Sequence, residues 1–350
     1  MATTAPEVQS TAHEQGCDRL QEQLPELASR GETRALCVET REANPADGGP
    51  ANSMMAAAVP ERCMGDYPND AWIIDRFVGC HRELVLLRVV EVPSGQQIGE
   101  VDLSVVNSLE VDPKTLTWNH SAQVFRVGAR GDVNGVIANA EATCDTGCTV
   151  ATSTPPSGLV LTNPQGSMTA NSIVDPAVPG SVVAGRTSWT ISYTQMGAAP
   201  SEPAVYTSEP VRCDNATPNA AAGCVLARYT PTLTYSFANN GELAQHVADA
   251  QASGLPGSPI SSALTRQTDP ELINKNRNTA CPGSLPRPDG TECDEYPFAS
   301  TNQGAFLGNG YSQRMILAGD NQQGGRELAA FYRTNRVMNF DPFYVEVVGS

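Results

Sequence analysis

The sequence predicts a multidomain, mainly β protein, in which a disulfide-rich antiparallel β-sandwich-like region precedes a small α+β domain. The 350 residues exceed the usual size of one domain. Short alternating or β-branched runs, separated by turn-forming residues, fill the middle of the chain and are typical of an antiparallel sandwich. The C-terminal part combines strand-like runs with a helical one, which predicts a separate α+β domain.

The first two predicted regions are residues 1–60 and 61–240. Residues 1–60 are polar, with a short helix expected between 17 and 34 because Leu20, Leu24 and Leu27 recur at helical spacing. In the β-rich region the Ser/Thr/Pro/Gly-rich run 152–179 is interpreted as a connection. Strands are expected at residues 82–92, 97–106, 122–127, 135–142, 181–183, 187–194 and 229–237.

Residues 241–267 are interpreted as a helix and linker, because a helical pattern over 240–253 is followed by the breaker-rich run 254–259. The last predicted domain covers residues 268–350. It is expected to contain a strand at 311–318, a turn at 320–325 (DNQQGG), a helix at 326–336 and a strand at 341–348.

The ten cysteines occur as sequence neighbours and predict local disulfides in an oxidising compartment. A zinc site is the alternative, but none of the four histidines stands at ligand spacing from a cysteine pair. No stretch is apolar for long enough to span a bilayer, so we expect a secreted, extracellular protein. The expected pairs are Cys17–Cys37, Cys63–Cys80, Cys144–Cys148, Cys213–Cys224 and Cys281–Cys293.

The formal charge of −16 is unevenly distributed. Residues 271–350 hold seven Lys/Arg against nine Asp/Glu, so the preceding residues carry net −14. Such an acidic region disfavours nucleic acid and anionic membranes, because phosphate contacts need cationic side chains. It could restrain a C-terminal site or act as a DNA mimic, and we favour the simpler role of keeping the protein soluble. The C-terminal part has enough arginines for a local phosphate-binding surface.

An acidic cluster at residues 289–301 (DGTECDEYPFAST) is the most informative segment for function. Glu292, Asp294 and Glu295 repel one another unless a cation or a proton lies among them, which is commonest at metal or acid/base sites. A solvated acidic loop beside a disulfide is the alternative. Oxygen ligands suit Mg²⁺ or Mn²⁺, with Ca²⁺ a further option, and a carboxylate beside the metal can accept a proton from water. No histidine lies in this segment, so a carboxylate would replace imidazole as the base.

Five motifs in order resemble the NucA/NucB deoxyribonuclease domain of secreted bacterial proteins. The resemblance covers about residues 270–348, roughly a quarter of the chain. Compact members of the family have a basic residue at the position of Cys293. The motifs are residues 281–288 (CPGSLPRP), 293–301 (CDEYPFAST), 320–325 (DNQQGG), 331–337 (FYRTNRV) and 341–345 (DPFYV).

The resemblance implies a metal-dependent, sequence-nonspecific endonuclease with a ββα-metal-like core and DNA as its substrate. It implies catalytic roles for Asp294, as general base, and for Glu295, in metal binding or orientation. Glu292 and Asp289 are not expected to take part. We expect the metal ligands among Asn321, Asp320, Glu327 and Asn335, and the phosphate contacts among Arg287, Arg314 and Arg326.

Two other readings remain open. The C-terminal domain could be an inactive nuclease that only binds DNA. Alternatively, the chain could be an adhesin-type surface protein whose β-rich region is the functional part. No obligate protein partner is evident from the sequence.

Overall fold

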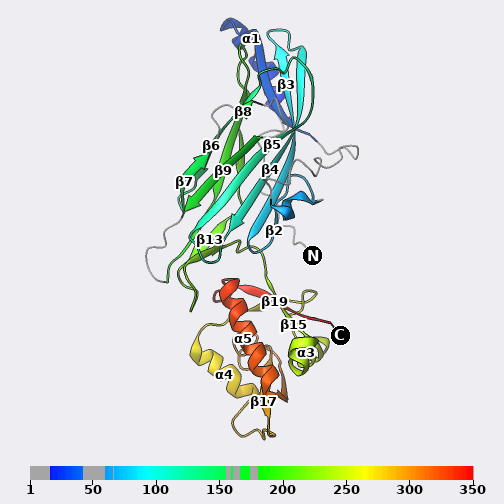
Figure 1. The fold of residues 1–350 in the computed structure, drawn as a ribbon, viewed down its shortest axis with the longest axis vertical. Coiled ribbons are helices and arrows are strands. Elements are labelled where there is room, and N and C mark those ends of the chain that lie inside the picture. The colour runs from blue at the N-terminus through cyan, green and yellow to red at the C-terminus, as the bar shows by residue number, and fades with distance from the viewer. Residues whose placement is uncertain are drawn as a thin grey trace. The chain divides into compact units, whose positions relative to one another are not determined.

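The computed structural model describes residues 16–41, 60–65, 67–154, 159–160, 166–173 and 180–349 (Figure 1). The polar N-terminal segment predicted for residues 1–60 therefore lies outside the described residues, except for its helix, one strand and Pro60. The chain forms two compact units. The first comprises Met1–Asp214 and Gly223–Arg228, and the second comprises Asn215–Ala222 and Tyr229–Ser350.

The first unit contains one α-helix, one 3-10 helix and fourteen strands in its described residues, and this confirms its mainly β character. The elements are α1 (Gly16–Ser29), β1 (Arg34–Thr40), η1 (Glu61–Met64), β2 (Ile73–Ile74), β3 (Val78–Glu91), β4 (Gln97–Val111), β5 (Thr117–Gly131), β6 (Ile137–Cys144), β7 (Thr149–Thr154), β8 (Leu159–Val160), β9 (Gly166–Ile173), β10 (Val182–Gly185), β11 (Thr187–Thr194), β12 (Ala204–Thr207), β13 (Val211–Asp214) and β14 (Gly223–Val225).

Two antiparallel sheets pack face to face in this unit. One has the order β1-β3-β4-β5-β9-β7 with β2 beside β3, and the other has the order β12-β11-β6-β8. Their shared core takes Val85, Leu87 and neighbours from the first sheet and Trp189 and Ile191 from the second. Alternate residues of strands such as β3, β4 and β11 supply the core, as the period-2 pattern predicted. The connection expected at residues 152–179 is partly wrong, because β9 pairs with both β5 and β7.

All five expected disulfides are present, and none of the ten cysteines is free. Four of them lie in the first unit. The fifth, Cys281–Cys293, joins the C-terminal end of a helix to a strand in the second unit. Because every cysteine sulfur is in a disulfide, no thiolate is available as a zinc ligand. The alternative of a cysteine-based zinc site is therefore excluded.

The second unit is a small α+β assembly. Its main sheet has the order β15-β19-β16, with β15 parallel and β16 antiparallel to β19, and β17 pairs with β18 in a separate hairpin. Two strands followed directly by a helix form the expected ββα arrangement. The elements are β15 (Thr232–Ser236), α3 (Phe237–Ala252), β16 (Leu264–Thr265), α4 (Pro270–Ala280), β17 (Thr291–Tyr296), β18 (Ser312–Leu317), α5 (Ala318–Thr334) and β19 (Pro342–Val348).

The second unit begins earlier in the chain than the sequence-based boundaries. The sequence predicts β15 as part of the β-rich region 61–240 and α3 as part of the helix and linker at 241–267. Both contribute to the second hydrophobic core, β15 through Leu233 and Tyr235 and α3 through Leu243 and Val247. The breaker-rich run 254–259 turns within this unit, where Gly257 N–H donates to the Ser262 carbonyl.

Helix α5 also begins earlier than expected. The turn predicted at residues 320–325 is wrong, because these residues form the first turns of α5. One of the two glycines in this run, Gly324, allows close packing between helices. A Cβ on Gly324 would lie 2.0 Å from Leu243 Cδ2, so only glycine lets α5 approach α3 this closely.

Candidate active site

A cavity of about 710 Å³ in the second unit collects the acidic cluster, part of α5 and three arginines. Its lining matters here because a well-formed pocket with polar groups directed into it is the default hypothesis for a binding site. The charged and amide side chains at the cavity are Glu292, Asp294, Glu295, Asn321, Gln267, Arg266, Arg277 and Arg287.

Asp294 lies on β17 with only 6% of its surface exposed. Its Oδ2 lies 2.6 Å from Nδ1 of His246, whose Nε2 lies 2.8 Å from Ser312 Oγ. Burial raises the pKa of the Asp294 carboxyl, and the hydrogen bond from His246 and the nearby Arg314 oppose this rise. Asp294 is therefore a buried carboxylate with a dedicated partner.

The presence of His246 corrects the expectation that no histidine belongs to the site. The residue lies 48 positions before Asp294, on the apolar face of α3, and has no exposed surface. Its neighbours on that face are Leu243, Val247 and Ala250, so the sequence pattern alone resembles an ordinary helix core. Only the contact between α3 and β17 reveals its partner.

Glu295 is the second carboxylate predicted to be catalytic, and it also lines the cavity. Burial and the adjacent Asp294 raise the pKa of Glu295 to about 7, whereas Arg277 and backbone N–H groups at Ala299 and Glu295 itself lower it. Its Oε2 lies 3.7 Å from the disulfide sulfur of Cys281. The structure thus brings Asp294 and Glu295 to one cavity.

Glu292 connects β17 to the start of α5. Its carboxylate accepts hydrogen bonds from Asn321 Nδ2 at 3.0 Å and from Gln322 Nε2 at 2.6 Å. The sequence expectation set Glu292 aside together with Asp289. The structure separates the two, because Glu292 lines the cavity and Asp289 is an exposed residue that does not.

Of the four predicted metal ligands, Asn321 lines the cavity and the other three do not. Asp320 Oδ2 accepts from the Glu242 backbone N–H at 2.8 Å. Glu327 accepts from Asn240 Nδ2 at 2.9 Å and from Gln323 Nε2 at 3.0 Å. Asn335 lies at the C-terminal end of α5, where Nδ2 donates to the Phe331 carbonyl.

The three predicted phosphate-binding arginines differ in whether they line the cavity. Arg287 lines the cavity and donates to the Cys281 carbonyl at 3.3 Å. Arg314 and Arg326 do not line it; Arg326 is exposed, and Arg314 forms an ion pair with Asp249 at 2.8 Å.

Sequence reasoning missed Arg266 at the cavity and gave Arg277 no role there. The Arg266 guanidinium lies 4.4 Å from the centre of the Tyr332 ring and donates to the Val337 carbonyl. Arg277 lies on the last turn of α4, one turn before Cys281. The one sequence feature that could have pointed to Arg277 is its position four residues before the disulfide-bonded Cys281.

The donor set at the cavity fits a hard divalent cation. Three carboxylates and one amide line it, from Glu292, Asp294, Glu295 and Asn321, although in the described residues the three carboxylates do not all lie within 4.8 Å of one another. Asn321 uses its Nδ2 for Glu292, so its oxygen is the atom left for a cation. Carboxylate and amide oxygens are the ligands that Mg²⁺, Mn²⁺ and Ca²⁺ prefer.

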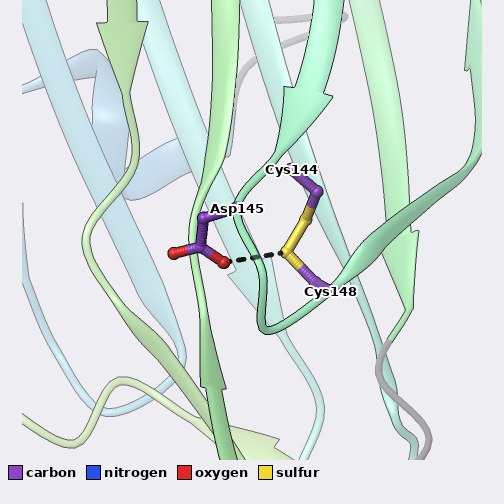
Figure 2. A group of neighbouring side chains, drawn as sticks. All are labelled: Cys144, Asp145 and Cys148. Carbon is purple, nitrogen blue, oxygen red and sulfur yellow. Dashed lines mark hydrogen bonds between the residues drawn. A yellow bond between two sulfur atoms is a disulfide. The ribbon is translucent and has the colours of Figure 1, made fainter.

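A different group meets a simple distance criterion for metal binding. Among the described residues, Cys144, Asp145 and Cys148 place one ligand atom each within 4.8 Å of one another (Figure 2). The two cysteines are joined by a disulfide, so neither offers a thiolate. Asp145 Oδ1 also accepts from the Gly147 N–H at 3.0 Å, as in an ordinary turn. This group is part of the β6–β7 turn and is not a metal site.

Comparison with known proteins finds a family match for the C-terminal part of the chain, which includes most of the residues described above. Residues 258–346 match the family of deoxyribonuclease NucA/NucB, so the C-terminal part of the chain carries a NucA/NucB-type domain. The matched range includes α4, β17, β18 and α5, and all of these elements except β18 contribute residues that line the cavity. His246 lies before the matched range. None of the curated proteins matches the chain.

Proposed function

We propose that the second unit is a secreted, metal-dependent endonuclease that hydrolyses DNA phosphodiester bonds without sequence preference. One observation carries the proposal: within the range matched to a deoxyribonuclease family, a single cavity holds the buried Asp294 and the half-buried Glu295 beside three arginines. Carboxylates for chemistry and guanidinium groups for phosphate are the two components that this reaction needs.

Asp294 is the proposed general base. A water molecule gives a proton to the Asp294 carboxylate while its oxygen attacks phosphorus, and the bond from phosphorus to one sugar oxygen breaks. Burial in a low-dielectric cavity strengthens the carboxylate as a base, because the ion is poorly solvated there. The leaving oxygen takes up a proton, so the products are a phosphomonoester and a hydroxyl.

Glu295, Glu292 and Asn321 are the proposed holders of the cation. When bound, Mg²⁺ or Mn²⁺ would neutralise the charge that develops on the phosphate and on the leaving oxygen. Glu295 is well suited because burial and the adjacent Asp294 raise its pKa, so a bound cation would stabilise its ionised form. The hydrogen bond between Glu292 and Asn321 fixes the start of α5 against β17 and so keeps the proposed ligands together.

Arg266, Arg277 and Arg287 are the proposed phosphate contacts. Guanidinium groups bind phosphate oxygens with directional, charge-assisted hydrogen bonds. Arg266 is held against Tyr332, which limits its rotation before DNA binds. Contacts made only to phosphates carry no sequence information, which supports cleavage without sequence preference.

Secretion is supported by five disulfides, which persist in oxidising compartments. No helix in the described part of the chain is long and apolar enough to cross a membrane.

A nicking assay on supercoiled plasmid tests the proposal. The full chain should cut with Mg²⁺ or Mn²⁺ and lose activity with a chelator. Asp294→Ala and Glu295→Ala should each lower the rate by about 100-fold or more, the usual range for loss of an acid/base group. Cutting that persists in Asp294→Ala would refute the mechanism. Binding to DNA without cutting under any divalent cation would favour an inactive binding domain.

A further inference from the structure

His246 is a buried side chain that the proposed mechanism does not yet use. Both of its ring nitrogens face a side-chain partner: Nδ1 faces Asp294 Oδ2 at 2.6 Å and Nε2 faces Ser312 Oγ at 2.8 Å. The three residues come from α3, β17 and β18. Rotation of the ring would break both contacts, so the imidazole has one favourable orientation.

The protonation of the ring follows from its partners. When Asp294 is ionised, its carboxylate can only accept a hydrogen bond, so Nδ1 then carries the proton and donates to Asp294. The Ser312 hydroxyl can donate to Nε2, so a neutral imidazole satisfies both contacts. The other charged groups near the pair are Glu295 on β17, Asp249 on α3 and Arg314 on β18, and the last two form an ion pair with each other.

We propose that His246 is the positioning residue for Asp294, a role that rests on the proposed function of this cavity. By binding Oδ2, His246 fixes the plane of the carboxylate and leaves Oδ1 as the oxygen that can accept a proton from water. Asp294 lies at the cavity, whereas His246 is not among the residues that line it. His246 therefore acts through Asp294 and does not contact DNA.

Packing alone does not explain a histidine at this position. The neighbouring core positions of α3 are Leu243, Val247 and Ala250, and an apolar side chain would suit the same surroundings. A buried imidazole costs free energy unless its polar atoms are paired. A leucine would instead remove the side-chain donor to the buried Asp294 carboxylate and leave it only the backbone N–H of Glu295, and a buried charge with too few partners is strongly unfavourable.

Two amide substitutions separate the two contacts of the ring. The amide nitrogen of asparagine reaches about as far from the backbone as Nδ1, and that of glutamine reaches about as far as Nε2. His246→Asn therefore keeps a donor for Asp294, whereas His246→Gln keeps only a group near Ser312. His246→Leu removes both.

Plasmid nicking by the full chain with Mg²⁺ should distinguish these variants through kcat. His246→Asn should stay within about tenfold of the unchanged protein. His246→Gln and His246→Leu should lose about 100-fold in kcat with little change in KM, because a misplaced base slows chemistry and not DNA binding. Equal activity of the Asn and Gln variants, or a fully active Leu variant, would overturn the proposal.

A double substitution separates this proposal from the proposed function. If Asp294→Ala cuts normally, the proposed function fails whatever His246 does. If Asp294→Ala is inactive and His246→Leu is active, only the positioning role fails. If Asp294→Ala and His246→Leu are each inactive, as both proposals expect, adding His246→Leu to Asp294→Ala should lower kcat no further, because the two residues act as one unit. A further loss there would point to a purely structural histidine.

Nuclear magnetic resonance of the protein without metal or DNA supplies a readout independent of activity. The Nδ1–H proton of His246 should be shifted far downfield by its hydrogen bond to the carboxylate. That signal should move upfield in Asp294→Ala while the melting temperature shows the unit still folded. An unchanged signal in the variant would contradict the proposed contact.

Discussion

Gly324 of α5 lies directly against Leu243 of α3, so that a Cβ on Gly324 would come within 2.0 Å of Leu243 Cδ2. Gly324→Ala should therefore lower the free energy of unfolding of the second unit by about 1–3 kcal/mol through overpacking. The adjacent Gly325 is the matched control, because a Cβ there meets nothing within 4 Å. Gly325→Ala should raise stability by up to about 1 kcal/mol, the helix preference of alanine over glycine. Thermal melting of both variants checks the pair, and equal melting temperatures would contradict the close packing.

Arg277 and Arg287 should each contribute about one phosphate contact. Replacing either with glutamine should weaken DNA binding and reduce the slope of log affinity against log salt by about 1. Arg326, which is exposed and away from the cavity, is the comparison, and Arg326→Gln should leave the slope nearly unchanged. Fluorescence anisotropy with labelled duplex DNA at several salt concentrations measures this. Equal changes for all three would mean that DNA is bound along a wider surface.

The metal should be bound by residues that line the cavity, and Asp320, which does not line it, should not contribute. Calorimetric titration of the full chain with Mn²⁺, without DNA, should show weaker binding in Glu295→Gln and Asn321→Ala, by about tenfold or more. Asp320→Asn should bind nearly as the unchanged protein does, because Asp320 faces the Glu242 backbone N–H and does not line the cavity. Stronger loss in Asp320→Asn than in Asn321→Ala would place the metal elsewhere.

The sandwich should lose stability as pH falls from 6.5 toward 4. Burial lowers the pKa of His81 to about 4 and of His120 to about 3, from an ordinary value of 6.5. Between these values the unfolded chain binds protons that the folded unit does not, so acid favours unfolding. For His81 alone the loss approaches roughly 3 kcal/mol at pH 4.

Tryptophan fluorescence can follow this unfolding, because all three tryptophans of the chain, Trp72, Trp118 and Trp189, belong to the first unit. His81→Phe keeps an aromatic ring beside Trp72 and removes the titrating group, so its stability should fall less with acid. Parallel curves for the two proteins would show that His81 is not the group responsible.

Local patterns predicted about half of the strands, including the three longest, and all of the disulfides. Strands such as β11, whose residues alternate between buried and half-buried, show their period directly in the sequence. Each cysteine pair is separated by only 4 to 20 residues, so neighbours in the sequence are partners in space. Long-range contacts were not predictable in this way.

At the candidate site, too, local features were predictable and long-range contacts were not. Asp294 and Glu295 stood out because like charges were adjacent in one short run. His246 did not, because its role depends on packing between α3 and β17, and a histidine among apolar residues has no sequence signature. The sequence predicts a turn for the DNQQGG run, whereas the run lies in α5 and Gly324 makes the contact with Leu243.

The position of β19 near the end of the chain determines when the second unit can complete its fold during synthesis. It lies between β15 and β16 in the main sheet of the second unit, and Phe343 and Val345 contribute fully buried side chains to the core. The ribosome reaches these residues after it has made Asp294, α4 and α5. A nascent or prematurely ended chain would therefore carry every proposed catalytic group and still lack the middle of the sheet. On this basis fragments from interrupted translation should not cut DNA.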